Sequence, residues 1–260
     1  MRHTCPREQA ERLDRLIAML DARLSPPPEV PDKRKALRAL MNLHSGEGLP
    51  PEFFALQDAE LTEQNEKKGR VELSAIPPSP LSPHLRLWRG DITRLAVDAI
   101  VNAANSRLLG CFHPLPNCID NIIHSGAGLQ LRGECRQLME AQGHEEPVGG
   151  AKITRAYNLP ARWVLHTVGP VVEGPAPTPL QCHQLASCYT SCLELGARHG
   201  LRSVAFCCIS TGVFHFPQDF AARIAVEAVL GFLRARHFDT VIFDVFTDAD
   251  ETLYRTLLGY

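Results

Sequence analysis

Apolar side chains recur at helical spacing in three segments at the start of the chain. Residues 6–24 place leucine and isoleucine side chains on one helix face and charged side chains on the others, and prolines at 26–28 end this pattern. A second helix is expected to start near residues 31–32, and a third to cover residues 52–68. Because these helices are short, they bury too little apolar surface to form much of a core alone, so we expect them to dock on the rest of the chain.

The pattern changes after the proline-rich segment AIPPSPLSP at residues 75–83. Such a composition is typical of a connector between two folded units. We therefore divide the chain into an N-terminal helical extension, residues 1–80, and a second domain, residues 81–260.

In the second domain, apolar runs alternate with amphipathic segments. Strands are expected in the runs LRLWRGD, AVDAIVNAAN, AKITRAY, RWVLHTVGP, SVAFCCIS and TVIFDVF. Helices are expected over residues 119–141, 181–199, 217–236 and 248–258. Strands that alternate with helices predict an α/β fold, in which helices cover both faces of a mostly parallel or mixed sheet. Ligands of such sheets bind at the carboxyl ends of the strands.

The composition limits which binding partners and which cellular compartment we expect for this protein. The formal net charge is −2 and no basic tract stands out, so nucleic acid is not expected as a main partner. No apolar run approaches the roughly 20 residues that a membrane-spanning helix needs, so no membrane partner is expected either. The chain starts without the apolar region of a signal peptide and carries nine cysteines at irregular spacing. We therefore expect a cytoplasmic protein whose thiols are reduced and either buried or bound to metal.

Two loops rich in small and polar residues follow predicted strands. The first continues from VNAAN toward a helix that starts near residues 118–123, and the second is ISTGVFHFP at residues 209–217. Glycine, serine and threonine let the backbone approach a ligand closely. Backbone N–H groups and helix N-termini at strand ends bind phosphate oxygens without a lysine. The two loops therefore predict an anion-binding cleft in a chain that is otherwise nearly neutral.

The motifs at these loops resemble those of the macrodomain family, the ADP-ribose-binding fold. They occur in the family's order over residues 83–260 and are GDIT, VDAIVNAAN, IDNIIH followed by SGAG, GGAKIT, VLHTVGP and STGVF. The resemblance implies a three-layer α/β/α sandwich with a mixed central sheet, preceded here by the helical extension. That extension and the variant CF…C…IDN are similar to the zinc-dependent microbial branch of MacroD-type protein-ADP-ribose hydrolases. Such enzymes remove mono-ADP-ribose from modified proteins, and the branch is linked to sirtuin-type ADP-ribosylation and lipoyl-carrier proteins.

The resemblance implies roles for residues at the first loop and the helix after it. Asp91 is expected to accept a hydrogen bond from the adenine amino group, with the backbone of Ile92 assisting. Asn105 is expected to face the ribose beside the scissile bond, where an amide can donate to one hydroxyl and accept from another. Asp120 is expected to activate the attacking water or to orient the ribose, and His124, one helical turn later, to support it. Either acid would also serve as a turn or helix cap.

The second loop and two strand ends supply the remaining candidates. The loop is expected to hold the diphosphate through backbone N–H groups and to cover a ribose with its phenylalanine. Its residues are Ser210, Thr211, Gly212, Val213 and Phe214. Phe246 follows the last predicted strand and is expected either to stack on adenine or to join the core. Asn102 is interpreted as a group that satisfies backbone polar atoms at a strand end, and His166 as a core histidine.

Two cysteines in the first loop point to a metal site. Thiolates and a histidine in one short loop suit tetrahedral zinc, with sulfur about 2.3 Å from the metal. Cys111 and Cys118 are the expected thiolate ligands of a Zn²⁺ ion. In the zinc-dependent branch the histidine stands where this chain has Pro116, which cannot ligate, so His113 is the candidate third ligand after a rearrangement of the loop. The alternative is a rigid loop with two free thiols.

Three functions use the same predicted cleft. The first is hydrolysis of the bond between ribose C1″ and a side-chain oxygen of a mono-ADP-ribosylated protein, through oxocarbenium-like charge on the sugar, with release of ADP-ribose. The second is a reader module that binds ADP-ribose without cleaving it, which the missing histidine favours. The third is deacetylation of O-acetyl-ADP-ribose. Turnover with and without a zinc chelator separates the enzymes from the reader.

Overall fold

The computed structural model describes residues 5–236 and 238–260, and within these ranges the chain forms nine strands arranged in two sheets. The strands are β1 (Val71–Glu72), β2 (Pro78–Ser79), β3 (Ser82–Arg89), β4 (Leu95–Ala96), β5 (Ala99–Ala103), β6 (Ala151–Arg155), β7 (Trp163–Thr167), β8 (Ser203–Phe206) and β9 (Thr240–Val245). The main sheet has the order β2-β3-β9-β8-β5-β7-β6, and β1 pairs with β4 in a small second sheet. The five inner strands of the main sheet run parallel, whereas β2 and β6 run antiparallel to their neighbours.

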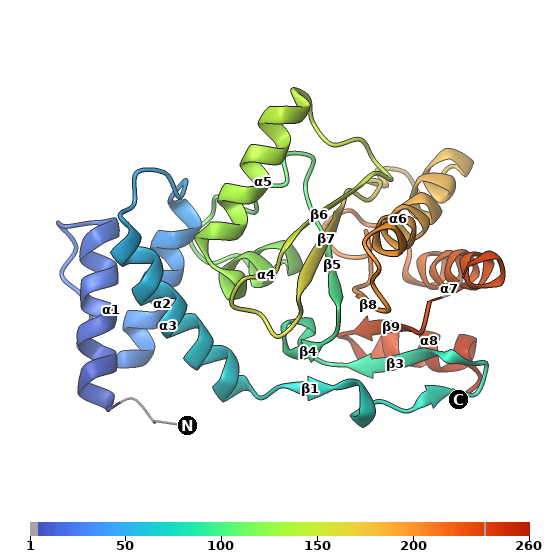
Figure 1. The fold of residues 1–260 in the computed structure, drawn as a ribbon. Helices are drawn as coiled ribbons and strands as arrows, with labels where there is room; N and C mark the ends of the chain where they lie inside the picture. The colour runs from blue at the N-terminus through green and yellow to red at the C-terminus, as the bar shows by residue number, and fades with distance from the viewer. Residues whose placement is uncertain (1–4, 237) are drawn as a thin grey trace.

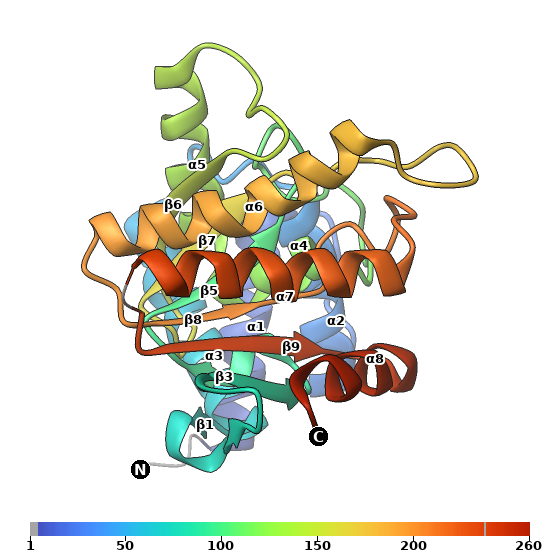
Figure 2. The ribbon, with the colours of Figure 1, turned by 90° about the vertical axis from the view of Figure 1, so that its right-hand side faces the viewer.

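Helices cover both faces of the main sheet (Figure 1). They are α1 (Pro6–Leu20), α2 (Val30–Leu43), α3 (Pro51–Lys68), α4 (Ile119–Ala127), α5 (Leu129–Gln142), α6 (Pro179–Arg198), α7 (Gln218–Ala235) and α8 (Asp248–Leu258), with short 3₁₀ turns η1 (Leu73–Ala75) and η2 (Ile92–Arg94). Helices α6, α7 and α8 form one layer, α4 and α5 the other, and α1 to α3 stack outside α4 (Figures 1 and 2). The expected three-layer α/β/α fold with a mixed sheet is confirmed. No helix in the described part of the chain is both long and apolar enough to span a membrane.

The single helix expected over residues 119–141 is wrong, because the chain breaks there into α4 and α5. Gly128 lies between them with φ +100°, a conformation that residues with a Cβ rarely adopt. A Cβ on Gly128 would also lie 2.5 Å from Nε2 of Gln57 in α3. The break therefore lets α3 approach the backbone at the start of α5, where the amide of Leu129 donates to Gln57 Oε1 at 2.9 Å.

The helical extension has a cluster of buried apolar side chains of its own, separate from the core of the main sheet. Leu13, Leu16, Leu37 and Phe53 are buried in it, and Leu129 of α5 completes it. The last residues of the extension already belong to the sheets of the second domain, since β1 pairs with β4 and β2 joins the edge of the main sheet. The extension is thus docked on the rest of the chain, as its short helices require.

The parallel strands direct several loops to one edge of the sheet. Strands β3, β9, β8 and β5 are consecutive neighbours and point the same way, so the segments after each of them leave the sheet on the same side. These segments contain the residues singled out from the sequence. The fold therefore places the candidates from residues 90–120, 209–217 and 246 along one edge.

Candidate functional site

Asp120 is the centre of a hydrogen-bonded group at the carboxyl end of β5. It lies in the first turn of α4 and is 4% exposed. Its Oδ1 accepts from Asn102 Nδ2 at 2.7 Å, and its Oδ2 accepts from Asn105 Nδ2 at 3.2 Å. Asn105 also donates to the carbonyl oxygen of Gly110 at 3.0 Å, which ties the amide to the loop that follows. The structure thus brings Asn105 and Asp120 together, as expected.

Burial raises the pKa of Asp120 above that of an exposed aspartate, and the hydrogen bond from Asn102 opposes this shift. The position at the helix N-terminus also favours the charged form, since unpaired backbone N–H groups of the first turn carry partial positive charge. The result is a carboxylate whose basicity is higher than usual. Such a group suits the transfer of a proton near neutral pH.

Two buried histidines lie behind Asp120. His166 of β7 pairs in register with Asn102 of β5, and its Nδ1 lies 3.2 Å from Asn102 Nδ2. Because the amide donates, Nδ1 accepts and the ring carries its proton on Nε2, which is 2.9 Å from Thr154 Oγ1. His124 Nε2 lies 3.5 Å from Asp120 Oδ1. Burial lowers the pKa of both histidines to about 3, so both rings are neutral at neutral pH.

The role expected for Asn102 is wrong. Its amide nitrogen bonds to the side chains of Asp120 and His166 rather than to backbone atoms, and its Oδ1 has no hydrogen-bond partner within the described residues. His166 is buried, as expected of a core histidine, but it also forms part of this polar group, together with Cys135, whose Sγ is 3.7 Å from His166 Nε2. Only the pairing of β5 with β7 reveals these contacts, since residues 102 and 166 are far apart in the sequence.

The two loop thiols face each other beside Asp120. Cys111 Sγ and Cys118 Sγ are 3.1 Å apart, and Cys111 Sγ is 3.8 Å from Asp120 Oδ2. The hydrogen bond from Cys111 lowers the pKa of Cys118 to about 7, whereas the pKa of Cys111 is raised. His113 is exposed, and no contact between it and either thiol is recorded in the described part of the chain. Its donor atoms would reach the thiols only after the loop rearranged.

The loop between the two cysteines is held in place by α2 and α5. Arg38 Nη2 donates to the carbonyl oxygen of Pro116 at 2.7 Å, and Asn42 Nδ2 donates to that of Pro114 at 2.8 Å. The guanidinium of Arg132 lies 4.5 Å from the centre of the Phe112 ring, a cation–π contact. These anchors come mainly from the helical extension, and nothing in the spacing of the sequence points to them.

The second loop closes on itself and leaves a row of backbone N–H groups available. Ser210 adopts φ +66°, and its carbonyl oxygen accepts from the amide of Phe216 at 3.0 Å. The amide of His215 donates to Gly212 at 3.0 Å. For the amides of residues 211–214, no acceptor is recorded among the described residues. Val213 is 74% exposed, so this turn faces solvent and has the geometry of an anion-binding loop.

The remaining candidates lie at the ends of β3 and β9. Asp91 caps η2 by accepting from the amide of Thr93 at 3.0 Å, and Ile92 is buried. Phe246 follows β9 and is 75% exposed, so it is not a core residue. Because β3 pairs with β9 up to Arg89 and Val245, residues 91 and 246 follow neighbouring strand ends. An exposed aromatic ring beside a carboxylate suits the binding of a planar base.

The fold and this edge define a mixed-sheet α/β protein in which a loop with unpaired backbone amides and a buried aspartate held by two asparagines follow neighbouring strands. The Macro domain family model matches residues 101–225. A protein of Treponema medium named protein-ADP-ribose hydrolase is 48% identical over 237 residues, covering 89% of this chain and 90% of the relative. A Staphylococcus aureus protein of the same name is 46% identical over 230 residues, covering 88% and 86%.

A solved structure shares the fold as well as the sequence. The Trypanosoma brucei macrodomain in complex with ADP-ribose is 31% identical, aligns with a TM-score of 0.67, and is matched over 91% of this chain and 97% of its own. The chain belongs to the macrodomain family.

Proposed function

We propose that the protein is an ADP-ribosyl hydrolase that removes mono-ADP-ribose from modified protein side chains and releases ADP-ribose. The observation that carries the proposal is the placement of Asp120 between Asn102 and Asn105 at the strand ends, in a chain 48% identical to a protein-ADP-ribose hydrolase over 89% of its length. A buried carboxylate next to an amide that can hold a sugar is the minimum that this reaction needs.

The nucleotide is assigned to the edge formed by the strand ends. The amides of residues 211–214 bind the diphosphate, since they lie in a surface turn and donate to no acceptor among the described residues. The carboxylate of Asp91 and the backbone of Ile92 bind the adenine, and Phe246 stacks on it. The solved complex of the Trypanosoma brucei macrodomain with ADP-ribose supports this class of ligand.

The chemistry follows from the position of Asp120. Asn105 orients the ribose through its Oδ1, which can accept from a ribose hydroxyl in addition to the amide of Arg107, because both N–H groups of Asn105 already donate to Gly110 and Asp120. Water adds to C1″ as the bond to the side-chain oxygen breaks through an oxocarbenium-like transition state. Asp120 accepts the proton from this water, and its raised pKa places it closer to the range in which a general base is effective. The departing oxygen takes up a proton, so the products are ADP-ribose and the unmodified side chain.

We also propose that Cys111 and Cys118 are ligands of a zinc ion. The thiols fit this role, since they face each other at 3.1 Å, are half-buried, and include one thiol with a pKa of about 7. Among the described residues His113 makes no hydrogen bond to either thiol in this loop conformation, and Asp120 Oδ2 lies 3.8 Å from Cys111 Sγ. When bound, zinc would polarise an oxygen of the ribose or of the leaving group. Elemental analysis of the purified protein and of Cys118→Ala tests this assignment.

The reader function is the second candidate, because the exposed His113 leaves the expected metal site short of a ligand. The two functions differ in turnover. A mono-ADP-ribosylated protein is incubated with the purified chain, with Asp120→Ala and with a zinc chelator, and free ADP-ribose is measured. Release that depends on Asp120 supports the hydrolase, whereas binding without release supports the reader. The target protein, for which the resemblance suggests a lipoyl carrier, stays a prediction.

A further inference from the structure

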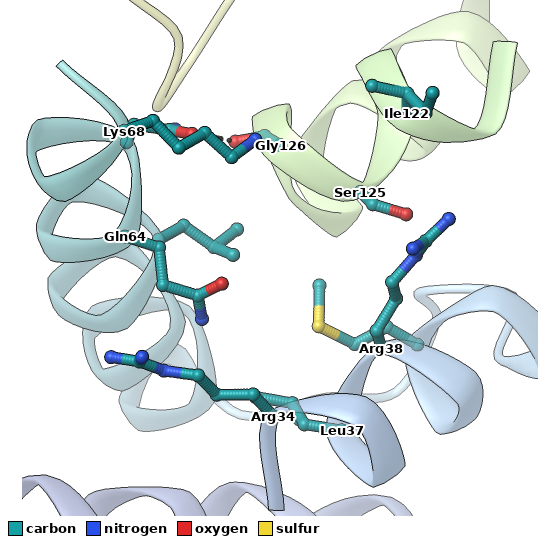
Figure 3. A pocket seen from close by; sticks show the side chains of 11 residues that line it. Arg34, Leu37, Arg38, Gln64, Lys68, Ile122, Ser125 and Gly126 are labelled. Carbon is teal, nitrogen blue, oxygen red and sulfur yellow. Dashed lines mark hydrogen bonds between the residues drawn. The ribbon is translucent and has the colours of Figure 1, made fainter. Parts of the chain in front are cut away.

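A cavity lies between the helical extension and α4, on the outer side of α4 (Figure 3). Its volume is about 180 Å³, and α2, α3 and α4 each contribute to its lining. Ile122, Ser125 and Gly126 of α4 face it. Since these residues are three and four positions apart, they form one helix face, and Asp120 and His124 lie on another, toward the sheet. The cavity is therefore separate from the strand-end site.

Three cationic side chains line this cavity, and no acidic residue does. Arg34, Arg38 and Lys68 stand around its open centre in Figure 3. The cations come from α2 and α3, whereas α4 contributes Ile122, Ser125 and Gly126, none of which is charged. A hollow lined in this way attracts an anion.

Nearby carboxylates neutralise the cations only in part. Arg34 Nε donates to Glu60 at 2.9 Å, but the buried Glu60 also pairs with Arg12. Lys68 Nζ is 3.5 Å from Asp91 Oδ2. Arg38 donates to neutral oxygens, and among the described residues no carboxylate partner is recorded for it. The surplus positive charge therefore centres on Arg38.

Two guanidinium nitrogens in this lining are buried without a partner. Arg34 Nη2 and Arg38 Nε have no hydrogen-bond acceptor in the described part of the chain. A buried N–H of a charged group without an acceptor is costly, so such groups mark the position of an absent oxygen atom. An oxyanion that reached Arg38 Nε would supply its missing acceptor.

The rest of the lining is apolar or neutral. Leu37, Met41, Leu61 and Ile122 are apolar lining residues that come from all three helices, and the amide of Gln64 points toward the centre (Figure 3). Inorganic phosphate would leave these apolar side chains without a contact. A ligand that carries both an oxyanion and a short apolar body offers contacts to both kinds of lining.

We propose that this cavity binds a small organic anion, a carboxylate on a short aliphatic body, through Arg34, Arg38 and Lys68. The proposal does not rest on ADP-ribose hydrolysis, because none of these side chains is assigned to the nucleotide or to catalysis; Lys68 contacts the strand-end site only through its ion pair with Asp91. Arg38 also holds the carbonyl oxygen of Pro116, so the occupant would lie one side chain away from the cysteine loop.

Calorimetric titration of the full chain with hexanoate tests the proposal. Hexanoate is expected to bind saturably with one site per chain, in the presence of saturating ADP-ribose as well as without it. Hexanamide, which has the same body without the charge, and acetate, which has the charge without the body, are each expected to bind at least tenfold more weakly. Equal binding of hexanamide, or displacement of hexanoate by ADP-ribose, would overturn the proposal.

Variants locate the binding to the cavity. Lys68→Met and Arg34→Met are each expected to weaken hexanoate binding at least tenfold, and circular dichroism verifies that the variants fold. Arg223→Met serves as the matched control, since Arg223 is exposed on α7 on the far side of the sheet, and it is expected to leave binding unchanged. Unchanged affinity in both cavity variants, or an equal loss in the control, would contradict the assignment.

Discussion

Asn102 donates a hydrogen bond of 2.7 Å from the end of β5 to Asp120 at the start of α4. The same amide nitrogen lies 3.2 Å from His166 Nδ1, so one side chain connects two strands and a helix around the carboxylate. Asn102 and His166 are fully buried. The aspartate is therefore positioned by the sheet through Asn102, and by the following loop through Asn105.

Replacing Asp120 with alanine is expected to slow hydrolysis strongly and to preserve ADP-ribose binding. A general base contributes about 10²- to 10⁴-fold to such a rate, and we expect a loss in that range. Release of ADP-ribose from a mono-ADP-ribosylated protein measures the rate, and calorimetry measures binding. A variant that retains the wild-type rate would show that Asp120 has no part in the chemistry.

Replacing Asn102 with alanine is expected to destabilise the fold and to change the ionisation of Asp120. The buried carboxylate loses its shortest hydrogen bond, and a loss of about 1–3 kcal/mol in the free energy of unfolding is expected. Since that bond lowers the pKa of Asp120, the pKa should rise further in the variant.

Denaturant unfolding and the pH–rate profile measure the two effects of the Asn102 change. Asn117→Ala is the control, because Asn117 is an exposed residue of the cysteine loop. If both variants unfold at the same denaturant concentration, the hydrogen bond to Asp120 carries no stability.

The two buried histidines are expected to make the protein sensitive to acid. Their pKa of about 3 in the folded state lies below the ordinary histidine pKa of 6.5, so the unfolded chain binds more protons between these values. The free energy of unfolding should therefore fall as the pH falls from 6.5 toward 3, by up to about 1.4 kcal/mol per pH unit for each ring. Asp120 acts in the opposite direction, because burial raises its pKa.

His124→Met isolates one of these contributions, since neither ring nitrogen of His124 has a hydrogen-bond partner within the described residues. The variant should lose less stability than the wild type between pH 6.5 and pH 4.5, as measured by urea unfolding. His183→Met, at an exposed position of α6, should follow the wild type. An unchanged slope for His124→Met would mean that this ring already titrates normally in the folded chain.

Replacing Asn42 with alanine tests whether the helical extension supports catalysis. Asn42 donates to Pro114 in the cysteine loop, and its Oδ1 accepts from Asn121 Nδ2 at 2.8 Å, beside Asp120. Loosening this loop is expected to lower the hydrolytic rate by about tenfold, because small displacements of reacting groups are costly.

The matched control for Asn42 is Lys35→Ala on the exposed side of α2. ADP-ribose affinity, measured by calorimetry, should stay unchanged in both variants. Equal rates in the two variants would show that the loop keeps its position without α2.

Periodicity located most elements of the fold but could not locate their interruptions. The helix expected over residues 217–236 is α7, Gln218–Ala235, because its apolar face repeats without a break. The helix expected over residues 119–141 contains the same periodicity, yet it breaks at Gly128. A Cβ at this position would overlap the side chain of Gln57. Because that contact joins positions far apart in the sequence, the local pattern cannot predict it.

The site residues also divide into those that the local sequence predicts and those that depend on contacts between distant positions. Asn105, Asp120 and the thiol pair follow from motifs, because the residues of each motif are close in sequence. The partners of Asp120 behind the sheet depend on the register of β5 with β7, which pairs Asn102 with His166. For Phe246 the sequence allows two roles, stacking on adenine or packing in the core, and its exposure excludes the core.

The hydrogen bonds from Arg38 and Asn42 fasten the cysteine loop to α2. A chain that began at β3 would retain every motif residue and still lack the donors that hold the carbonyl oxygens of Pro114 and Pro116. A shortened version of this protein should therefore keep α2, and changes to that helix should spare these two side chains.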